Sequence, residues 1–229
     1  KKEVRRFYKT VGGNEGGKCH YNTRLDLYGC GCQHDCSYCY AKSLLNFRGL
    51  WDAKEPAVAD LDKVEKRIEK LEPGSIVRLG GMTDCFQPLE ETERVTLATI
   101  ELLNKYGIGY LIVTKSDLIC EYMHILDKQL AHIQISTTWI PAEKAVSTER
   151  RIKAIERLEK AGFDVAVRLS PYVPQFVDFA RLNSIQCQKI QVEFLRVNHW
   201  IKKWLPLDYT EYTVHHAGYD HLPLEKKIE

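Results

Sequence analysis

The sequence predicts an α/β fold in which a parallel sheet, covered by crossover helices, forms an incomplete barrel. Short β-rich segments alternate with amphipathic helical segments from residue 25 onward. Such alternation is typical of right-handed crossovers between parallel strands. The chain holds six of these units, whereas a complete barrel has eight in about 250 residues. We therefore expect a partial (β/α)6 barrel, with a doubly wound open sheet as the alternative.

Six segments rich in aliphatic and β-branched residues are expected to form the strands. They are residues 24–28, 75–79, 109–114, 132–137, 164–169 and 189–197. Three segments with helical periodicity lie between them, at residues 60–71, 92–106 and 148–161. Pro73 and Gly74 end the first helix, and Gly162 is expected to cap the third.

Charge separates a basic N-terminal arm from the rest of the chain. The 229 residues contain 33 Lys+Arg and 31 Asp+Glu, a net charge of +2. Residues 1–24 hold seven basic and two acidic side chains, a net +5, which leaves −3 for the remainder. We expect a short irregular arm at 1–24, the barrel at 25–198 and a C-terminal extension at 199–229. The arm could contact phosphates by releasing counterions, or it could be a solvated terminus.

The composition excludes several classes of protein. With 44% hydrophobic and 28% charged residues, the chain is neither disordered nor fibrous. No segment approaches the roughly 18 consecutive apolar residues of a membrane span, and the first residues lack the apolar core of a signal peptide. We expect a soluble, cytoplasmic protein with no membrane contact, and the missing initiator Met suggests a trimmed start.

Four of the eight cysteines fall within ten positions, directly after the first predicted strand. In a reducing cytosol such a group indicates a metal or redox site rather than disulfides. Cys32, Cys36 and Cys39 have the spacing Cys-x3-Cys-x2-Cys. Three thiolates in one loop can hold three irons of a four-iron cluster and leave the fourth iron open. A zinc site is the alternative, with His34 or a C-terminal histidine as the fourth ligand.

The segment at residues 31–41, Gly-Cys-Gln-His-Asp-Cys-Ser-Tyr-Cys-Tyr-Ala, resembles the signature of the radical S-adenosylmethionine (SAM) superfamily. Residues 80–90, Gly-Gly-Met-Thr-Asp-Cys-Phe-Gln-Pro-Leu-Glu, and 114–116, Thr-Lys-Ser, are similar to the branch containing spore photoproduct lyase and the DNA repair photolyase-like proteins. The similarity covers most of residues 25–198. It implies a partial barrel of the radical SAM type, a 4Fe-4S cluster and SAM as cofactors.

The resemblance also implies roles for individual residues. Cys32, Cys36 and Cys39 would bind the cluster, and Tyr38 would lie against the adenine of SAM. One electron would cleave SAM to a 5′-deoxyadenosyl radical that abstracts hydrogen from a substrate. The remaining SAM-binding residues would stand at the ends of the predicted strands, at Gly80, Gly81, Thr83, Asp84, Lys115, Ser136 and Arg168.

Several of these residues have a structural alternative. Thr83 or Asp84 could cap the turn after the second strand, and Lys115 could be a solvated loop residue. Ser136 could satisfy a local backbone group. Arg168 could pair with Glu193, at a matching inward position on the sixth strand, instead of with an anion.

Cys85 is the candidate for a catalytic hydrogen donor. Spore photoproduct lyase uses a cysteine near the segment at 80–90 for this purpose, although this sequence has Gly81 or Met82 where that cysteine aligns. Outside the cluster motif, small buried or surface positions are expected for Cys19, Cys30, Cys120 and Cys187.

These expectations describe a radical SAM enzyme, of lyase or transferase type, that is reduced by a partner such as flavodoxin or ferredoxin. The branch and the basic arm favour a substrate that is nucleic acid or derived from a nucleobase. Two alternatives remain open. One is radical modification of a peptide or a small metabolite, and the other is a cluster-binding redox or interaction module that does not turn over SAM.

Overall fold

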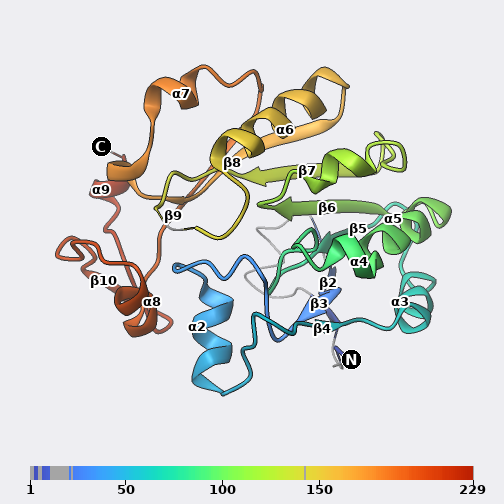
Figure 1. Cartoon of the computed structure of the whole chain (residues 1–229), viewed down its shortest axis with the longest axis horizontal. Helices are drawn as coiled ribbons and strands as arrows, with labels where there is room; N and C mark the ends of the chain where they lie inside the picture. The colour runs from blue at the N-terminus through green and yellow to red at the C-terminus, as the bar shows by residue number, and fades with distance from the viewer. Residues whose placement is uncertain (1–2, 5–6, 11–20, 22, 142, 229) are drawn as a thin grey trace.

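A computed structural model describes residues 3–4, 7–10, 21, 23–141 and 143–228 of the chain. A seven-stranded sheet runs through it in the order β1-β2-β5-β6-β7-β8-β9 (Figure 1). All neighbours from β2 to β9 are parallel, and β1 is an antiparallel strand at the edge. The strands are β1 Tyr8–Thr10, β2 Thr23–Leu25, β5 Ile76–Leu79, β6 Gly109–Thr114, β7 Ala131–Ser136, β8 Asp164–Tyr172 and β9 Ile190–Phe194.

The six predicted strands are therefore all present, as β2 and β5 to β9. The sheet is open, because its edge strands β1 and β9 do not pair with each other. The predicted α/β class and partial barrel are confirmed.

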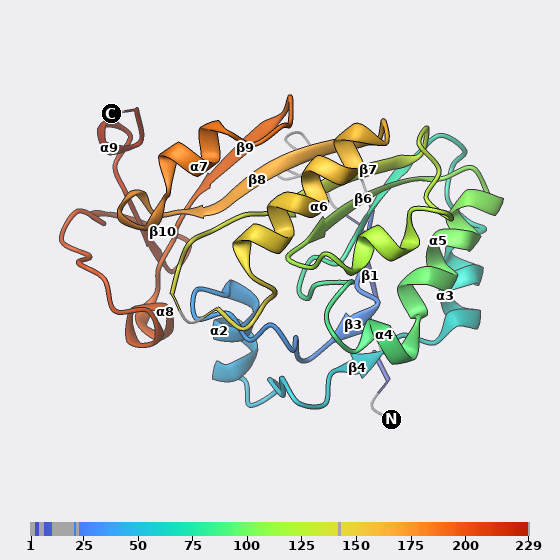
Figure 2. The ribbon, with the colours of Figure 1, turned by 45° about the horizontal axis from the view of Figure 1, so that its top comes forward.

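The three predicted helical segments also form helices. They contain α3 Leu61–Ile68, α5 Val95–Lys105 and α6 Thr148–Lys160. In Figure 2, α6 lies along β7 and β8, and α3 and α5 lie side by side at the other end of the sheet. The β6 to β7 connection contains only a 3-10 helix, η1 Leu118–Tyr122, and the β8 to β9 connection contains η2 Pro174–Phe176 and α7 Phe179–Asn183.

The helix predicted at 92–106 is interrupted at Arg94, whose φ of 52° lies in the left-handed region. Arg94 lies between a short helix, α4 Glu90–Glu93, and α5. The buried carboxylate of Glu90 accepts hydrogen bonds from the backbone amides of Thr96 and Leu97, both at 3.0 Å. These amides belong to the first turn of α5 and have no partner within that helix. The preceding helix therefore caps α5, which the periodicity of the sequence did not indicate.

The C-terminal extension packs beside the cysteine loop. Helix α8 His199–Trp204 lies next to α2 Tyr40–Phe47 (Figure 1). A second hydrophobic cluster contains Ile201 of α8, Leu205 at the C-cap of this helix, and Cys36 and Tyr38 of the cysteine loop. The remaining elements are two small sheets, β3 Tyr28–Gly29 with β4 Ala57–Val58 and β10 Val214–His216 with β11 Tyr219–His221, and the helix α9 Glu225–Ile228.

Part of the predicted arm belongs to the sheet. Phe7 is buried in the main core and residues 8–10 pair with β2. Residues 1–2, 5–6 and 11–20, with most of the basic side chains of the arm and Cys19, lie outside the described residues. The boundaries proposed for the arm, the barrel and the extension stay predictions. Across the described residues, no helix is both long and apolar enough to span a membrane.

Candidate active site

A cavity of about 500 Å³ opens at the carboxyl ends of the parallel strands. Its wall is formed by the cysteine loop, the loop after β5 and the ends of β6 to β9. Active sites of α/β barrels are located at this end of the strands. Of the predicted site residues, all except Cys85 line the cavity, namely Cys32, Cys36, Cys39, Tyr38, Gly80, Gly81, Thr83, Asp84, Lys115, Ser136 and Arg168.

The three cysteines of the motif lie in one compact loop before α2. The backbone amide of Asp35 donates to the carbonyl of Cys32 at 3.0 Å, and that of Cys39 donates to the carbonyl of Cys36 at 3.2 Å. Cys39 is also the N-cap of α2, because its Sγ accepts from the backbone amide of Lys42. Burial raises the pKa of all three thiols. A bound metal centre would hold them as thiolates.

Gly31 allows this loop to approach the chain at residue 52. A Cβ atom at residue 31 would lie 1.8 Å from the carbonyl oxygen of Asp52. The backbone amide of Asp52 in turn donates to the carbonyl of Cys30 at 2.7 Å. A larger residue at 31 would therefore displace the cysteine loop.

The loop after β5 is held by a buried carboxylate that the sequence reasoning missed. Asp26 Oδ1 accepts from the backbone amides of Gly81, at 2.6 Å, and Met82, at 2.9 Å. The hydroxyl of Thr83 donates to the carbonyl of Tyr28 at 2.7 Å. The only available signal was an acidic residue between two leucines in the predicted strand.

Asp84 connects three loops around the cavity. Its Oδ1 accepts from the backbone amide of Phe86 at 2.8 Å, and its Oδ2 accepts from that of Lys115 at 2.7 Å. Oδ2 also lies 3.1 Å from His34 Nε2 in the cysteine loop. Burial opposes ionisation, but His34 and the two amides keep the pKa of Asp84 below its ordinary value. The Asp84 carboxylate therefore caps the turn after β5, which was the structural alternative for this residue. Its contact with an ammonium group stays a prediction.

Lys115, Tyr38 and Ser136 meet at the wall of the cavity. Lys115 Nζ lies 5.3 Å from the centroid of the Tyr38 ring, and the Tyr38 hydroxyl donates to Glu143. Burial lowers the pKa of Lys115, although the neighbouring thiols partly offset this effect. Ser136 is 3% exposed at the end of β7. Lys115 is half-buried at the cavity, and its contact with SAM stays a prediction.

Arg168 forms an ion pair with Glu193, which was the structural alternative to binding an anion. Its guanidinium lies 2.5 Å from Glu193 Oε2 and donates to Gln134 Oε1 at 2.7 Å. The hydroxyl of Ser170 donates to the same Glu193 oxygen at 2.8 Å. Arg168 thus has partners without any bound anion, and its contact with SAM stays a prediction.

A row of cations on the cavity wall was not predicted. Lys9, Arg24 and Arg78 are register neighbours across β1, β2 and β5, and all three line the cavity. Arg24 Nε lies 3.1 Å from Asp26 Oδ2, and Arg78 donates to the Tyr21 hydroxyl at 3.1 Å. Neighbouring like charges repel each other. The row therefore creates a site that an anion would stabilise.

The complete lining of the cavity is strongly basic. It contains six Lys or Arg side chains and two carboxylates. Arg196 stands between two aromatic rings, 5.0 Å from the centroid of Tyr40 and 4.9 Å from that of Tyr219. Positive charge in a concave site attracts anionic ligands.

Comparison with known protein families shows to which family the cysteine motif belongs. Residues 27–179 match the Radical SAM superfamily. The chain belongs to the radical SAM superfamily. A 4Fe-4S cluster and SAM are the cofactors of these enzymes, which also need an electron donor.

The chain is similar to one curated protein and to several solved structures. It is 27% identical over 162 residues to the uncharacterized protein MJ0683 of Methanocaldococcus jannaschii, covering 65% of this chain and 60% of that protein. A variant of spore photoproduct lyase matches with a TM-score of 0.71 and 16% identity, over 99% of this chain and 74% of its own. Another variant, with bound AdoMet and dinucleoside spore photoproduct, matches with a TM-score of 0.65 and 17% identity, over 98% and 74%. These structural likenesses show a shared fold.

The thiols of this radical SAM chain suit a cluster better than a single metal ion. Within the described ranges, no group of three or more His, Cys, Asp or Glu side chains is placed to hold one ion. In a four-iron cluster each thiolate binds a different iron, so the sulfur atoms need not converge on one point. Two buried thiols and one half-buried thiol at one cavity fit such a cluster, and Cys32, Cys36 and Cys39 would hold it.

Cys85 is separated from the radical SAM cavity. Its side chain is 1% exposed and belongs to the main hydrophobic core. Burial also raises the pKa of its thiol. The predicted role as hydrogen donor therefore has no support in the geometry. Away from the cavity, Cys120 Sγ lies 3.9 Å from the carbonyl of Ala154 and Cys187 Sγ lies 3.5 Å from that of Val165.

Proposed function

We propose that this chain is a radical SAM enzyme that cleaves SAM reductively. Its substrate is nucleic acid or a nucleobase derivative that carries phosphate. When bound, the cluster and SAM supply a 5′-deoxyadenosyl radical that abstracts hydrogen. The observation that supports the substrate class is the row of cations along one wall of the cavity. A reducing cytoplasm would keep the cluster thiols available.

The residues around the thiols have distinct roles in this proposal. Gly80 and Gly81 allow the loop after β5 to pack closely at the cavity, because a Cβ atom at residue 81 would lie 1.8 Å from the Arg24 side chain. Lys115 and Ser136 supply an ammonium and a hydroxyl for SAM, and Tyr38 supplies a ring for its adenine. Thr83 and Asp84 hold the loop that presents these groups, in addition to any contact with SAM.

The cation row faces a different part of the cavity from Lys115. Arg24 and Arg78 come from β2 and β5, beside the loop of Gly80 and Gly81. A guanidinium binds phosphate through paired hydrogen bonds. The bound dinucleoside of the solved relative is consistent with a nucleotide-like substrate. We therefore place the radical chemistry at the thiols and the phosphate at the row.

Oligonucleotide binding tests the substrate class. The cluster-loaded enzyme is titrated with a short fluorescent oligonucleotide at several salt concentrations, as is the variant Arg78→Ala. We expect Arg78→Ala to weaken binding and to reduce the slope of log K against log salt by about 1. Lys66→Ala, an exposed lysine in the last turn of α3, is the control and should change neither.

Deuterium transfer tests the reaction itself. A deuterated oligonucleotide that serves as substrate would place deuterium in 5′-deoxyadenosine, and a deuterated peptide would not. If the oligonucleotide neither binds nor alters the cleavage of SAM, the substrate proposal is wrong.

A further inference from the structure

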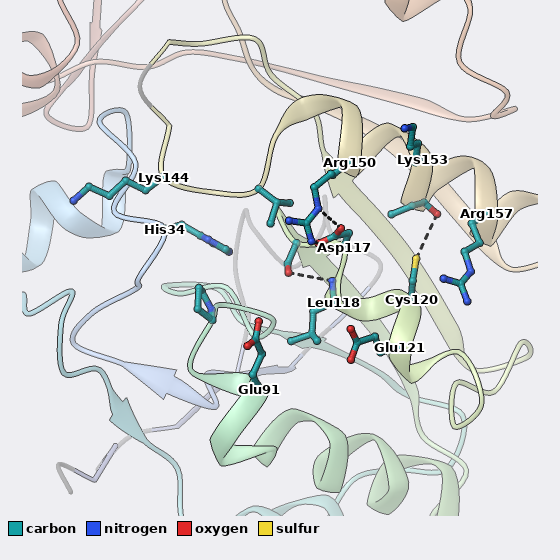
Figure 3. A pocket seen from close by; sticks show the side chains of 14 residues that line it. His34, Glu91, Asp117, Leu118, Cys120, Glu121, Lys144, Arg150, Lys153 and Arg157 are labelled. Carbon is teal, nitrogen blue, oxygen red and sulfur yellow. Dashed lines mark hydrogen bonds and ion pairs between the residues drawn. The ribbon is translucent and has the colours of Figure 1, made fainter.

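A second cavity lies on the other side of the cysteine loop. It has a volume of about 360 Å³ and is lined by η1, the first part of α6 and the residues around α4 (Figure 3). We call it the outer cavity. No predicted site residue lines it, and no part of the proposed function uses it.

One side chain separates the two cavities. Of the described residues, His34 alone lines both of them. It is 2% exposed and stands in the sequence between Cys32 and Cys36. Neither ring nitrogen has a hydrogen-bond partner of good geometry among the described residues, although Nε2 lies 3.1 Å from Asp84. The outer cavity therefore touches the cysteine loop through the imidazole of His34.

The position of the outer cavity suits electron entry. A radical SAM enzyme must receive one electron for each reductive cleavage, and SAM and substrate would fill the cavity at the strand ends. A donor that approached through that cavity would compete with them. Electron transfer slows steeply with distance, so a second cavity that touches the cysteine loop at His34 is the favourable route.

The charges at the rim of the outer cavity indicate the kind of partner. Arg150, Lys153 and Arg157 are all exposed and lie on one face of α6, as their spacing of three and four residues requires. Lys144 continues this cationic rim beyond the start of the helix and lies 2.8 Å from Asp35 of the cysteine loop. Figure 3 shows Arg150, Lys153 and Arg157 along α6, with Lys144 set apart on the loop that precedes the helix.

The opposite wall is acidic. Glu91 of α4 and Glu121 of η1 are exposed there, and Asp117 is engaged by Arg150 at 2.7 and 3.0 Å. A partner would therefore meet positive charge on the α6 side and negative charge on the η1 side. This asymmetry favours one orientation of an acidic surface, held against α6.

We propose that the outer cavity and the exposed face of α6 are the docking site of the electron donor, a small acidic protein of the flavodoxin or ferredoxin type. The proposal rests on the proposed function, because only an enzyme with a reducible cluster needs this partner. One electron leaves the flavin or iron–sulfur centre of the donor, which is oxidised by one electron. The cluster that Cys32, Cys36 and Cys39 would hold would accept this electron and be reduced by one. No bond forms or breaks.

Reduction kinetics with two reductants test the docking site. The cluster-loaded enzyme is mixed anaerobically with reduced flavodoxin or with dithionite, and the cluster absorbance is followed by stopped flow. The variants carry Lys153→Glu with Arg157→Glu, or Lys153→Gln with Arg157→Gln. The control carries Lys66→Glu with Lys70→Glu, two exposed lysines in and just after α3.

We expect the Glu variant to slow reduction by flavodoxin at least about tenfold at low salt, with a smaller effect in the Gln variant. Reduction by dithionite and all rates of the control should be unchanged, and about 0.5 M salt should remove the difference. Carbodiimide cross-linking should join flavodoxin carboxylates to Lys153.

Two results would overturn the proposal. If flavodoxin reduces the Glu variant as fast as the original enzyme, with the dithionite rate also normal, the docking site is wrong and the proposed function stands. If neither reductant reduces the cluster of the original enzyme, the proposed function fails and the docking site fails with it.

Discussion

The imidazole of His34 lies 3.1 Å from the carboxylate of Asp84, and the two side chains are 3% and 10% exposed. His34 belongs to the cysteine loop, and Asp84 belongs to the loop after β5. Asp84 also accepts a backbone hydrogen bond from Lys115, after β6. This carboxylate thus sets the relative positions of the thiols, the glycine pair and the lysine that surround the cavity.

Replacement of Asp84 tests this link. Asp84→Ala leaves the buried amides of Phe86 and Lys115 without acceptors, each of which costs about 1–3 kcal/mol. We expect the free energy of unfolding to fall by about 3 kcal/mol, measured by urea denaturation, and the iron content per chain to fall. Asp62→Ala, at an exposed position in the first turn of α3, should cost less than about 1 kcal/mol.

Two glycines with similar backbone angles should respond differently to alanine. Gly80 has a φ of 74° and Gly49 a φ of 65°, so a Cβ is unfavourable at both. At residue 80 the Cβ would also lie 2.4 Å from the carbonyl oxygen of Thr83, whereas nothing lies within 4 Å at residue 49. We expect Gly49→Ala to cost about 1 kcal/mol and Gly80→Ala about 3 kcal/mol in urea denaturation. Equal costs would contradict the close approach at Gly80.

Glu90 is the buried centre of a hydrogen-bond network. It caps α5 through Thr96 and Leu97 and accepts from the hydroxyls of Tyr28 and Tyr122. Glu90→Ala removes the acceptor of all four groups and should lower the free energy of unfolding by about 3–5 kcal/mol.

The neighbouring Glu91→Ala is the control for Glu90→Ala, since Glu91 is exposed on the same helix. It should change the stability by about 0.5 kcal/mol at most. A similar cost for both substitutions would show that Glu90 is not the cap of α5.

Asp164 should make the stability depend on acidic pH. Burial alone would raise its pKa, but Lys189, at 2.5 Å, and His132, at 2.6 Å, hold the pKa below the ordinary value. A lowered pKa in the folded state contributes stability above the ordinary Asp pKa, near 4. This stability is lost as the pH falls through the lowered value. Asp164→Asn should therefore reduce the decrease in the urea midpoint of unfolding between about pH 6 and 3. An unchanged dependence of this midpoint on pH would contradict the pairing of Asp164 with Lys189 and His132.

The sequence predicted features that repeat locally. Short runs of aliphatic and β-branched residues located the six parallel strands, and the spacing of Cys32, Cys36 and Cys39 located the cluster loop. The resemblance to the radical SAM superfamily then predicted Lys115 and Ser136 at strand ends beside these thiols, and both residues line the same cavity as the cysteines. Parallel strands bring their carboxyl ends to one edge, so no tertiary information was needed.

Features that depend on contacts between distant segments were not predicted. The cation row requires the register of β1, β2 and β5, which the separate segments do not specify. Arg94 interrupts a continuous helical pattern because a carboxylate from the preceding helix caps α5. The direction of the Cys85 side chain depends on the turn held by Asp84, so its burial in the core could not be read from its neighbours in the sequence.

Cleavage of SAM tests the central claim most directly. The chain is reconstituted anaerobically with iron and sulfide, given dithionite and SAM, and assayed for 5′-deoxyadenosine by mass spectrometry. We predict that the original chain and Cys187→Ser form this product and that Cys36→Ser forms none and loses its iron. A preparation with an intact, reducible cluster that forms no 5′-deoxyadenosine would contradict the account.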